Sequence, residues 1–145
     1  MKKLFLTNEG SMKIGELVNN VLQWGSDRQI LAGDHGNAQS NPLAQCDKLS
    51  EELNETISAI SKSLALIEIQ EDLENEIFAK NIQSQILDHS KEVIDGLGDM
   101  MVVLIILHGL LEVSPEETLQ FAWDEIKDRK GKMINGKFIK ESDLQ

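Results

Sequence analysis

The stretch of sequence that most constrains the fold is residues 92–111, EVIDGLGDMMVVLIILHGLL. Its first half carries three acids, and its second half, residues 100–107, is apolar on every side. At ~100° per residue in an α-helix, Glu92, Asp95 and Asp99 fall on one stripe of the helix surface. Like charges at this spacing repel each other, and their burial against an apolar core is costly. A bound divalent cation would remove both penalties, whereas the alternative is a solvated acidic turn at the positive end of a helix.

Residues 92–113 are expected to form the central helix of the fold. A helix that is apolar all round must be buried on all sides, and a chain of 145 residues has few helices to cover it. We therefore expect this helix to lie at a subunit interface. The apolar run of eight residues is too short for a membrane span, which needs ~20 residues.

The composition excludes several classes of protein. The formal charge of −11 argues against a nucleic-acid partner, which requires a basic surface, although a metal ion could still bridge nucleotide phosphates to carboxylates. Cys46 is the only cysteine, so the chain has no internal disulfide and no thiolate metal cluster. The apolar part of the N-terminal segment is too short for a signal peptide. We expect a soluble, cytoplasmic protein.

The spacing of apolar residues predicts helices along most of the chain. A stripe at i, i+3, i+4 and i+7 marks residues 12–25 as an amphipathic helix. Residues 33–42 predict a polar loop, and His35 lies within it. At its end, Asn41 and Pro42 are suited to be the N-cap and the first residue of the next helix. Residues 58–90 contain no glycine or proline and predict one or two helices, with a break near Gln70 or Asn81.

The C-terminal part predicts one more helix and a hairpin. Ser114, Pro115 and Glu117 form the pattern of a capping box with proline in the first turn, and this helix is expected to run through Ile126 into residues 127–132. Asn-Gly at positions 135–136, between short apolar runs, indicates a β-hairpin. The predicted fold is all-α: one domain over residues 1–145, with four to five helices, a small C-terminal hairpin and a frayed N-terminal extension.

The acidic and basic residues suggest phosphate chemistry. Glu52 and Glu55 would lie ~4.5 Å apart along a helix axis and can converge on one cation, although such a pair is most often part of a solvated face. Carboxylates without a cysteine or histidine cluster favour Mg²⁺ or Mn²⁺. Lys127, Arg129 and Lys130 could supply counter-charge for phosphates. Since no Walker-type loop and no Ser-His-Asp set is present, metal-activated water attacking a phosphoanhydride is the simplest reaction these residues could perform.

Four segments carry a more specific pattern. They are Trp24-x-x-Asp27-Arg28-x-Ile30, Lys48-x-x-Glu51-Glu52-x-x-Glu55, Asp95-Gly-Leu-Gly-Asp99-Met-Met-Val-Val-Leu and residues 125–140. In this order they resemble the MazG-like all-α nucleoside triphosphate pyrophosphohydrolases, and most closely the small phage and bacterial members. The similarity covers most of the chain from about residue 17 to residue 140, apart from the middle.

The resemblance implies an activity, a cofactor and an assembly. It implies a helical bundle that oligomerises as a dimer or a dimer of dimers and uses Mg²⁺ to hydrolyse NTPs or dNTPs to the monophosphate and pyrophosphate. The metal ligands that it implies are Glu52, Glu55 and Asp99, helped by Asp95 or Glu92. Glu51 or Glu52 would orient or deprotonate the attacking water.

The resemblance also implies groups that contact the substrate. It assigns phosphate contacts to Lys127 and Lys130, with Arg129, although each of them is equally suited to a basic C-terminal turn that satisfies the helix dipole. Lys48 and Gln45 lie towards the metal face. Trp24 and Arg28 would help to form the base pocket, although Trp24 is also a natural core residue, and the core is the favoured expectation for it.

The sequence departs from the family pattern at two places. The glutamate of the family's Glu-x-x-Asp motif falls on Gly96, so Asp95, with Glu92 behind it, is the expected substitute. About 40 residues separate Glu55 from Asp95, so residues 58–90 are expected to be an elongated helical insertion. Gly96 raises a rival hypothesis, a non-catalytic helical interaction protein that retains the fold. A second rival is a phosphohydrolase of another nucleotide, such as an alarmone.

Overall fold

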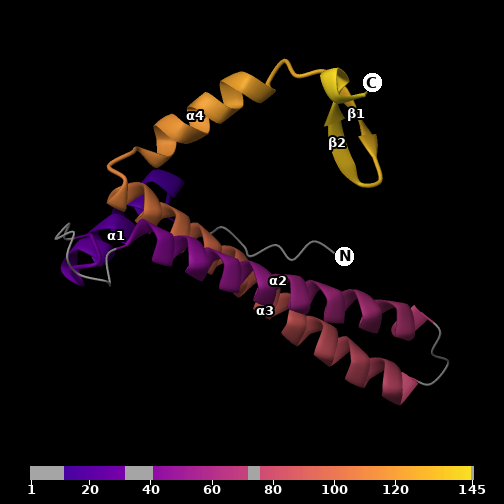
Figure 1. Ribbon diagram of the computed structural model, residues 1–145. Helices are drawn as coiled ribbons and strands as arrows, with labels where there is room; N and C mark the ends of the chain where they lie inside the picture. The colour runs from indigo at the N-terminus through magenta and orange to yellow at the C-terminus, as the bar shows by residue number, and fades with distance from the viewer. Residues whose placement is uncertain (1–11, 32–40, 72–75, 145) are drawn as a thin grey trace. The chain divides into compact units, whose positions relative to one another are not determined.

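The computed structural model describes residues 12–31, 41–71 and 76–144, except for the side chain of residue 71. The expectations for residues 1–11 and for most of the loop around His35 lie outside these residues. Four α-helices and one two-stranded sheet are present in the described part of the chain (Figure 1). The predicted all-α character with a small C-terminal hairpin is therefore confirmed. The chain divides into two compact units, residues 1–111 and residues 112–145, and each is described by itself.

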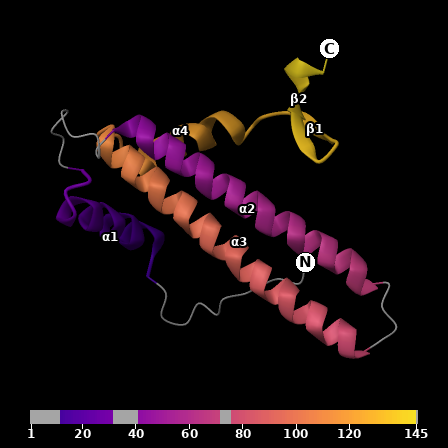
Figure 2. The same ribbon diagram turned by 60° about the horizontal axis from the view of Figure 1, so that its bottom comes forward.

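The first unit is built on a long helical hairpin. Helix α2 (Pro42–Glu71) and helix α3 (Glu76–Leu110) run antiparallel and side by side (Figures 1 and 2). As predicted, α2 begins at Pro42, and the Asn41 side chain accepts a hydrogen bond of 2.9 Å from the Leu43 amide. Residues 58–71 and 76–90 therefore belong to the two arms of this hairpin. Of the two expected break points, the one near Gln70 is confirmed, whereas α3 continues unbroken through Asn81.

The prediction that residues 92–113 form a helix of their own is wrong. These residues continue a helix that begins at Glu76, and that helix ends at Leu110. Glu92, Asp95 and Asp99 therefore lie in the interior of α3, beyond the first turn where the helix dipole acts on a charge. The alternative explanation of these acids as a helix-start turn is therefore also wrong.

Small residues bring α2 and α3 close together. Thr56 and Ser63 are buried on α2, and Gly96 is buried on α3 opposite Thr56. The Thr56 hydroxyl donates a hydrogen bond of 2.8 Å to the Glu52 carbonyl of its own helix. A Cβ atom on Gly96 would collide with the Thr56 Oγ1 atom. Glycine at position 96 is thus required by the helix contact.

Helix α1 (Ile14–Asp27) packs against the C-terminal part of α3. Two glycines make this contact possible. A Cβ atom on Gly25 would lie 2.5 Å from the Ile106 Cδ1 atom, and a Cβ atom on Gly109 would lie 2.9 Å from Leu22 Cδ2 and from Leu31 Cδ2. The helix predicted for residues 12–25 is therefore present, with bounds shifted by two residues at each end.

Helix α3 contains a stretch that is long and apolar enough to cross a membrane, judged by length and composition alone. Core helices of soluble proteins satisfy the same criterion, so this stretch is weak evidence. The expected cytoplasmic location stays a prediction.

The second unit contains helix α4 (Pro115–Ile126) and an antiparallel hairpin of β1 (Gly131–Ile134) and β2 (Lys137–Lys140), followed by the 3-10 helix η2 (Glu141–Asp143). Ser114 caps α4 as predicted, because its hydroxyl accepts a 3.2 Å hydrogen bond from the Glu117 amide. The helix ends at Ile126 and does not continue into residues 127–132. Asn135 and Gly136 both have positive φ, 49° and 74°, as the expected two-residue turn requires.

Candidate functional site

The α2–α3 hairpin has two distinct long faces. Along each helix, pocket-lining residues precede a buried residue by one position: Glu55 precedes Thr56 on α2, and Asp95 precedes Gly96 on α3. One residue is a rotation of ~100°, and because the helices are antiparallel, the same offset turns both stripes towards the same side of the hairpin. The pattern of burial therefore places the acids of both helices on one long face.

The acids gather in one pocket between the two helices, which we call the acidic pocket. Its lining contains all five carboxylates that the sequence assigned to the metal: Glu52, Glu55, Glu92, Asp95 and Asp99. Gly96 lies in the floor between them, and Lys62 and Ser58 complete the polar lining. The structure thus brings together acids that are about 40 residues apart in the sequence.

Lys48 neutralises the innermost acid of the pocket. Its ammonium group lies 2.7 Å from a carboxylate oxygen of Glu52, whose side chain is only 9% exposed, and 3.2 Å from the exposed carboxylate of Glu51. Hydrogen bonds to Glu52 and then to Glu51 raise the pKa of Lys48 well above its usual range. Lys48 therefore remains charged at neutral pH. Glu51 is held by this contact on the surface and does not line the acidic pocket.

The other acids of the pocket are mostly uncompensated. Glu92 lies 2.8 Å from the Nδ1 atom of His89, which carries a charge only when it is protonated. Within the described part of the chain, Glu55, Asp95 and Asp99 have no basic group within ion-pair distance. The pocket therefore holds an excess of negative charge that a cation would relieve.

A hard cation fits the chemistry of this donor set. Carboxylate oxygens without thiols are the ligands that Mg²⁺ and Mn²⁺ select. As the side chains stand, however, no three described histidine, cysteine or acidic residues are gathered closely enough to hold one ion. A bound cation would therefore have to draw the carboxylates together by side-chain rotation.

A second pocket adjoins the first and has a different character. Most of its wall is formed by the apolar and aromatic side chains of Trp24, Ile30, Val102, Val103 and Ile106. Gln45 and Lys48 also line it. Glu52 and Asp99 line both pockets, so the two are neighbours. We call this second pocket the tryptophan pocket.

Trp24 is exposed over 41% of its surface, which favours the pocket over the core as its role. The Arg28 guanidinium lies 4.6 Å from the centroid of the Trp24 ring, within the range of a cation–π contact. Arg28 is not part of the pocket lining. It therefore supports the tryptophan from outside the pocket.

The three predicted basic residues lie in the second unit. Lys127 contacts Asp124 at 2.8 Å, and Arg129 lies 3.9 Å from Glu125. The hydrogen bond from Lys127, followed by the one from Gln120, lowers the pKa of Asp124. Lys130 is exposed. The predicted phosphate contacts of these residues stay predictions.

Lys62 and Ser58 are site residues that the sequence analysis missed. Their signal was the continuation of the Glu55 stripe at i+3 and i+7, positions that return to the same side of a helix. Val102, Val103 and Ile106 were missed as pocket residues because apolar side chains at helical spacing predict only burial.

No family model matches the chain, and comparison with curated proteins and with solved structures finds no significant match. The resemblance found in the motifs stays a prediction.

Proposed function

We propose that the protein is a Mg²⁺-dependent nucleoside triphosphate pyrophosphohydrolase, which converts NTPs or dNTPs to the monophosphate and pyrophosphate. One observation carries the proposal: Glu52 and Glu55 of α2 share a pocket with Glu92, Asp95 and Asp99 of α3. A bound cation would relieve the repulsion between these like charges. Phosphates bridged by that cation are the natural ligands of such a site.

The proposed metal ligands are the five carboxylates of the acidic pocket. Bound Mg²⁺ polarises a phosphoryl oxygen and makes a water molecule more acidic. Both glutamates considered as the base are paired with Lys48, but only Glu52 lines the pockets. Glu52 accepts a proton from the attacking water, whose oxygen joins the α-phosphorus. The bond to the bridging oxygen breaks, and pyrophosphate leaves with the electron pair.

The tryptophan pocket is the proposed site for the nucleoside. Its apolar walls and the Trp24 ring suit a base, and the amide of Gln45 can both donate and accept hydrogen bonds. Because Glu52 and Asp99 line both pockets, a nucleotide bound there directs its phosphates towards the acids. A cytoplasmic role in nucleotide-pool housekeeping or phage nucleotide metabolism is part of this proposal.

The basic residues of the second unit remain part of the proposal through the family resemblance. Lys127 and Arg129 already pair with acids of α4. A phosphate would therefore have to displace Asp124 or Glu125 from these pairs. Lys130 forms no ion pair with an acid among the described residues. Charge reversal at Lys130 is therefore the cleaner test of phosphate binding by these residues.

The activity is tested by incubating the protein with Mg²⁺ and a panel of NTPs and dNTPs and separating the products. Glu55→Gln is the informative variant, because Glu55 makes no ion pair that its loss would break. Glu68→Gln, an exposed acid of the same helix, is the matched control. Monophosphate and pyrophosphate from the wild type and the control, but not from Glu55→Gln, support the proposal. No turnover of any nucleotide by the wild type, with Mg²⁺ or Mn²⁺, refutes it.

The rival function is a non-catalytic interaction protein. The observation that favours it is the lack of a preformed group of three metal ligands among the described residues. It predicts that neither Mg²⁺ nor nucleotide raises the melting temperature of the protein, whereas the enzyme hypothesis predicts that both do.

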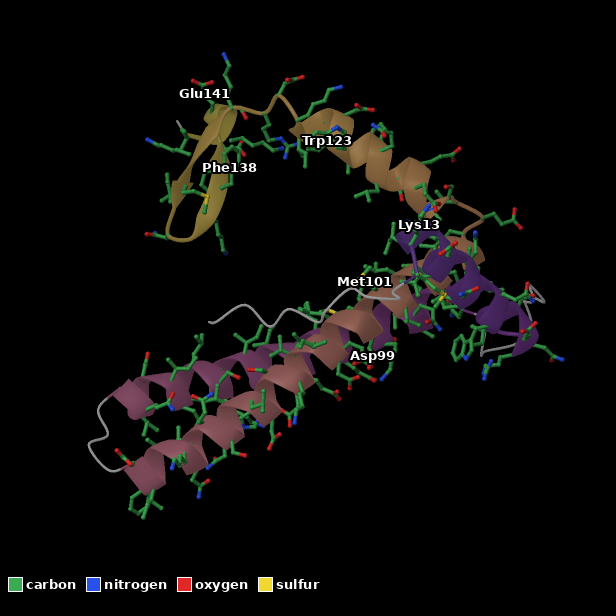
Figure 3. All side chains as sticks on the ribbon, turned by 180° about the vertical axis from the view of Figure 1, so that it is seen from behind. Lys13, Asp99, Met101, Trp123, Phe138 and Glu141 are labelled. Carbon is green, nitrogen blue, oxygen red and sulfur yellow. The ribbon has the colours of Figure 1, made fainter. Side chains whose placement is uncertain are left out.

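We also propose that a second copy of the chain covers the apolar face of the hairpin. This face consists of exposed residues that follow buried ones by one position, Leu53, Ile57, Ile60 and Leu64 on α2 and Leu97 and Leu104 on α3, together with the exposed Met101. Because each residue is rotated by ~100° from the one before it, this face lies opposite the acidic pocket, and Figure 3 shows Met101 and Asp99 on opposite sides of α3. A flat stripe of this kind is self-complementary about a two-fold axis. Two hairpins joined in this way form a four-helix bundle with the acidic pockets directed outwards.

A further inference from the structure

Lys62 lines the acidic pocket, although no motif of the sequence assigned it a function. It follows Glu55 by seven residues, which is close to two full helical turns, so both side chains leave α2 on the same side. The Cα–Cβ bond of a helical residue is tilted towards the helix N-terminus, which directs Lys62 back towards Ser58 and Glu55. Lys62 thus places a positive charge in a pocket whose other charged residues are all acids.

The charge of Lys62 is not used by a protein contact. Among the described residues, no carboxylate lies within 4.0 Å of its ammonium group. Lys48 differs in this respect, because it is held by Glu52 and Glu51. Lys62 is therefore the pocket lysine that remains available to an anionic ligand.

The two pockets and Lys62 follow one another along the hairpin. The tryptophan pocket reaches the acidic pocket at Glu52 and Asp99. Lys62 lies ten residues beyond Glu52 on α2, which corresponds to ~15 Å along the helix axis before its side chain reaches back. The order is therefore an aromatic pocket, then carboxylates, then a free ammonium group. A nucleoside triphosphate has the same order of parts: a base, phosphates bridged by metal, and a terminal phosphate.

We propose that Lys62 binds the terminal phosphate of the triphosphate chain and the same group of the pyrophosphate product. This assignment rests on the proposed function. Lysine suits the role, because its ammonium group is a compact charge that holds phosphate oxygens by charge-assisted hydrogen bonds. A nucleoside diphosphate bound through its base lacks the group that reaches Lys62. Lys62 therefore selects triphosphates over diphosphates.

The direct test is a calorimetric titration of the whole protein with inorganic pyrophosphate in the presence of Mg²⁺. Lys62→Gln removes the charge, Lys62→Arg retains it, and Lys80→Gln removes an equivalent charge from an exposed position of α3 outside the acidic pocket. Loss of a hydrogen bond to a charged group predicts roughly 10-fold or greater weakening for Lys62→Gln. Lys62→Arg and Lys80→Gln should bind pyrophosphate nearly as tightly as the wild type does. Circular dichroism verifies that each variant keeps its helix content.

Three results would overturn the role of Lys62. The first is that Lys62→Gln binds pyrophosphate as tightly as the wild type does. The second is that Lys80→Gln loses as much affinity as Lys62→Gln, which would mean that only the overall charge matters. The third is that the wild type does not bind pyrophosphate. The product assay separates these failures from failure of the proposed function. If the wild type still releases monophosphate and pyrophosphate, the enzyme assignment stands and only the role of Lys62 is refuted. A ratio of triphosphate to diphosphate turnover that is unchanged in Lys62→Gln would likewise refute it.

Discussion

Gly96→Ala should destabilise the α2–α3 hairpin, although alanine is the better helix former. In a helix interior, replacing glycine by alanine stabilises by ~0.5–1 kcal/mol. At position 96 the new methyl group would collide with the Thr56 hydroxyl. That hydroxyl is fixed by its hydrogen bond to the Glu52 carbonyl, so it cannot rotate away without losing a contact. Overpacking of this kind costs ~1–3 kcal/mol.

Gly98→Ala is the matched control for this prediction. Gly98 lies on the same helix, is exposed, and has no described atom within 4 Å of the position that an alanine methyl group would take. Gly98→Ala should therefore show only the gain in helix propensity, and Gly96→Ala should be less stable than Gly98→Ala by ~1–3 kcal/mol. With a urea dependence of ~2 kcal/mol per molar, the midpoints should differ by roughly 0.5–1.5 M when both variants are measured at one protein concentration.

The double variant Thr56→Ala/Gly96→Ala identifies the atoms responsible. When Thr56 is alanine, the collision is removed, and adding Gly96→Ala should stabilise the protein about as much as Gly98→Ala does. Equal stability of Gly96→Ala and Gly98→Ala would refute the close approach of the two helices. A penalty that persists when Thr56 is alanine would refute the assignment to its hydroxyl.

Three further predictions concern other parts of the chain. Lys48→Met leaves the buried Glu52 carboxylate without its partner, so it should lower the urea midpoint more than Lys91→Met, which breaks only an exposed pair; equal effects would contradict this. Met101→Glu should convert a dimer to a helical monomer in sedimentation velocity, and an unchanged mass would exclude the apolar face as the interface. Ser114→Ala should make the Glu117 amide exchange roughly 5-fold faster, because loss of an N-cap costs ~1 kcal/mol.

Much of the fold could be predicted from local signals. Proline at the start of α2, serine at the start of α4 and Asn-Gly in the hairpin each act within a few residues, and all three occur as predicted. The start of α3 was predicted only approximately, from the break expected near Gln70, because residues 58–90 contain no glycine or proline to mark it. The continuation of this helix into residues 92–110 was not predicted.

The candidate site was predictable in part. Acids on one helical stripe of α3 and a Glu-x-x-Glu pair on α2 could be recognised by spacing alone, and both sets line one pocket. The reason for Gly96 could not be recognised, because it depends on which residue of α2 lies opposite. The role of Ile30, which lines the tryptophan pocket between elements of the first unit, depends on tertiary packing in the same way.

The measurement that tests the central claim most directly is a Mn²⁺ titration followed by electron paramagnetic resonance, with Mg²⁺ as competitor. Asp95→Asn removes a carboxylate of the acidic pocket, whereas Asp88→Asn removes one from the same helix that is paired with Lys91 outside the pocket. We predict that the wild type and Asp88→Asn bind Mn²⁺, that Mg²⁺ displaces it, and that Asp95→Asn binds it at least ~10-fold more weakly. Equal affinity in the two variants, or no binding by the wild type, would contradict a metal site between α2 and α3.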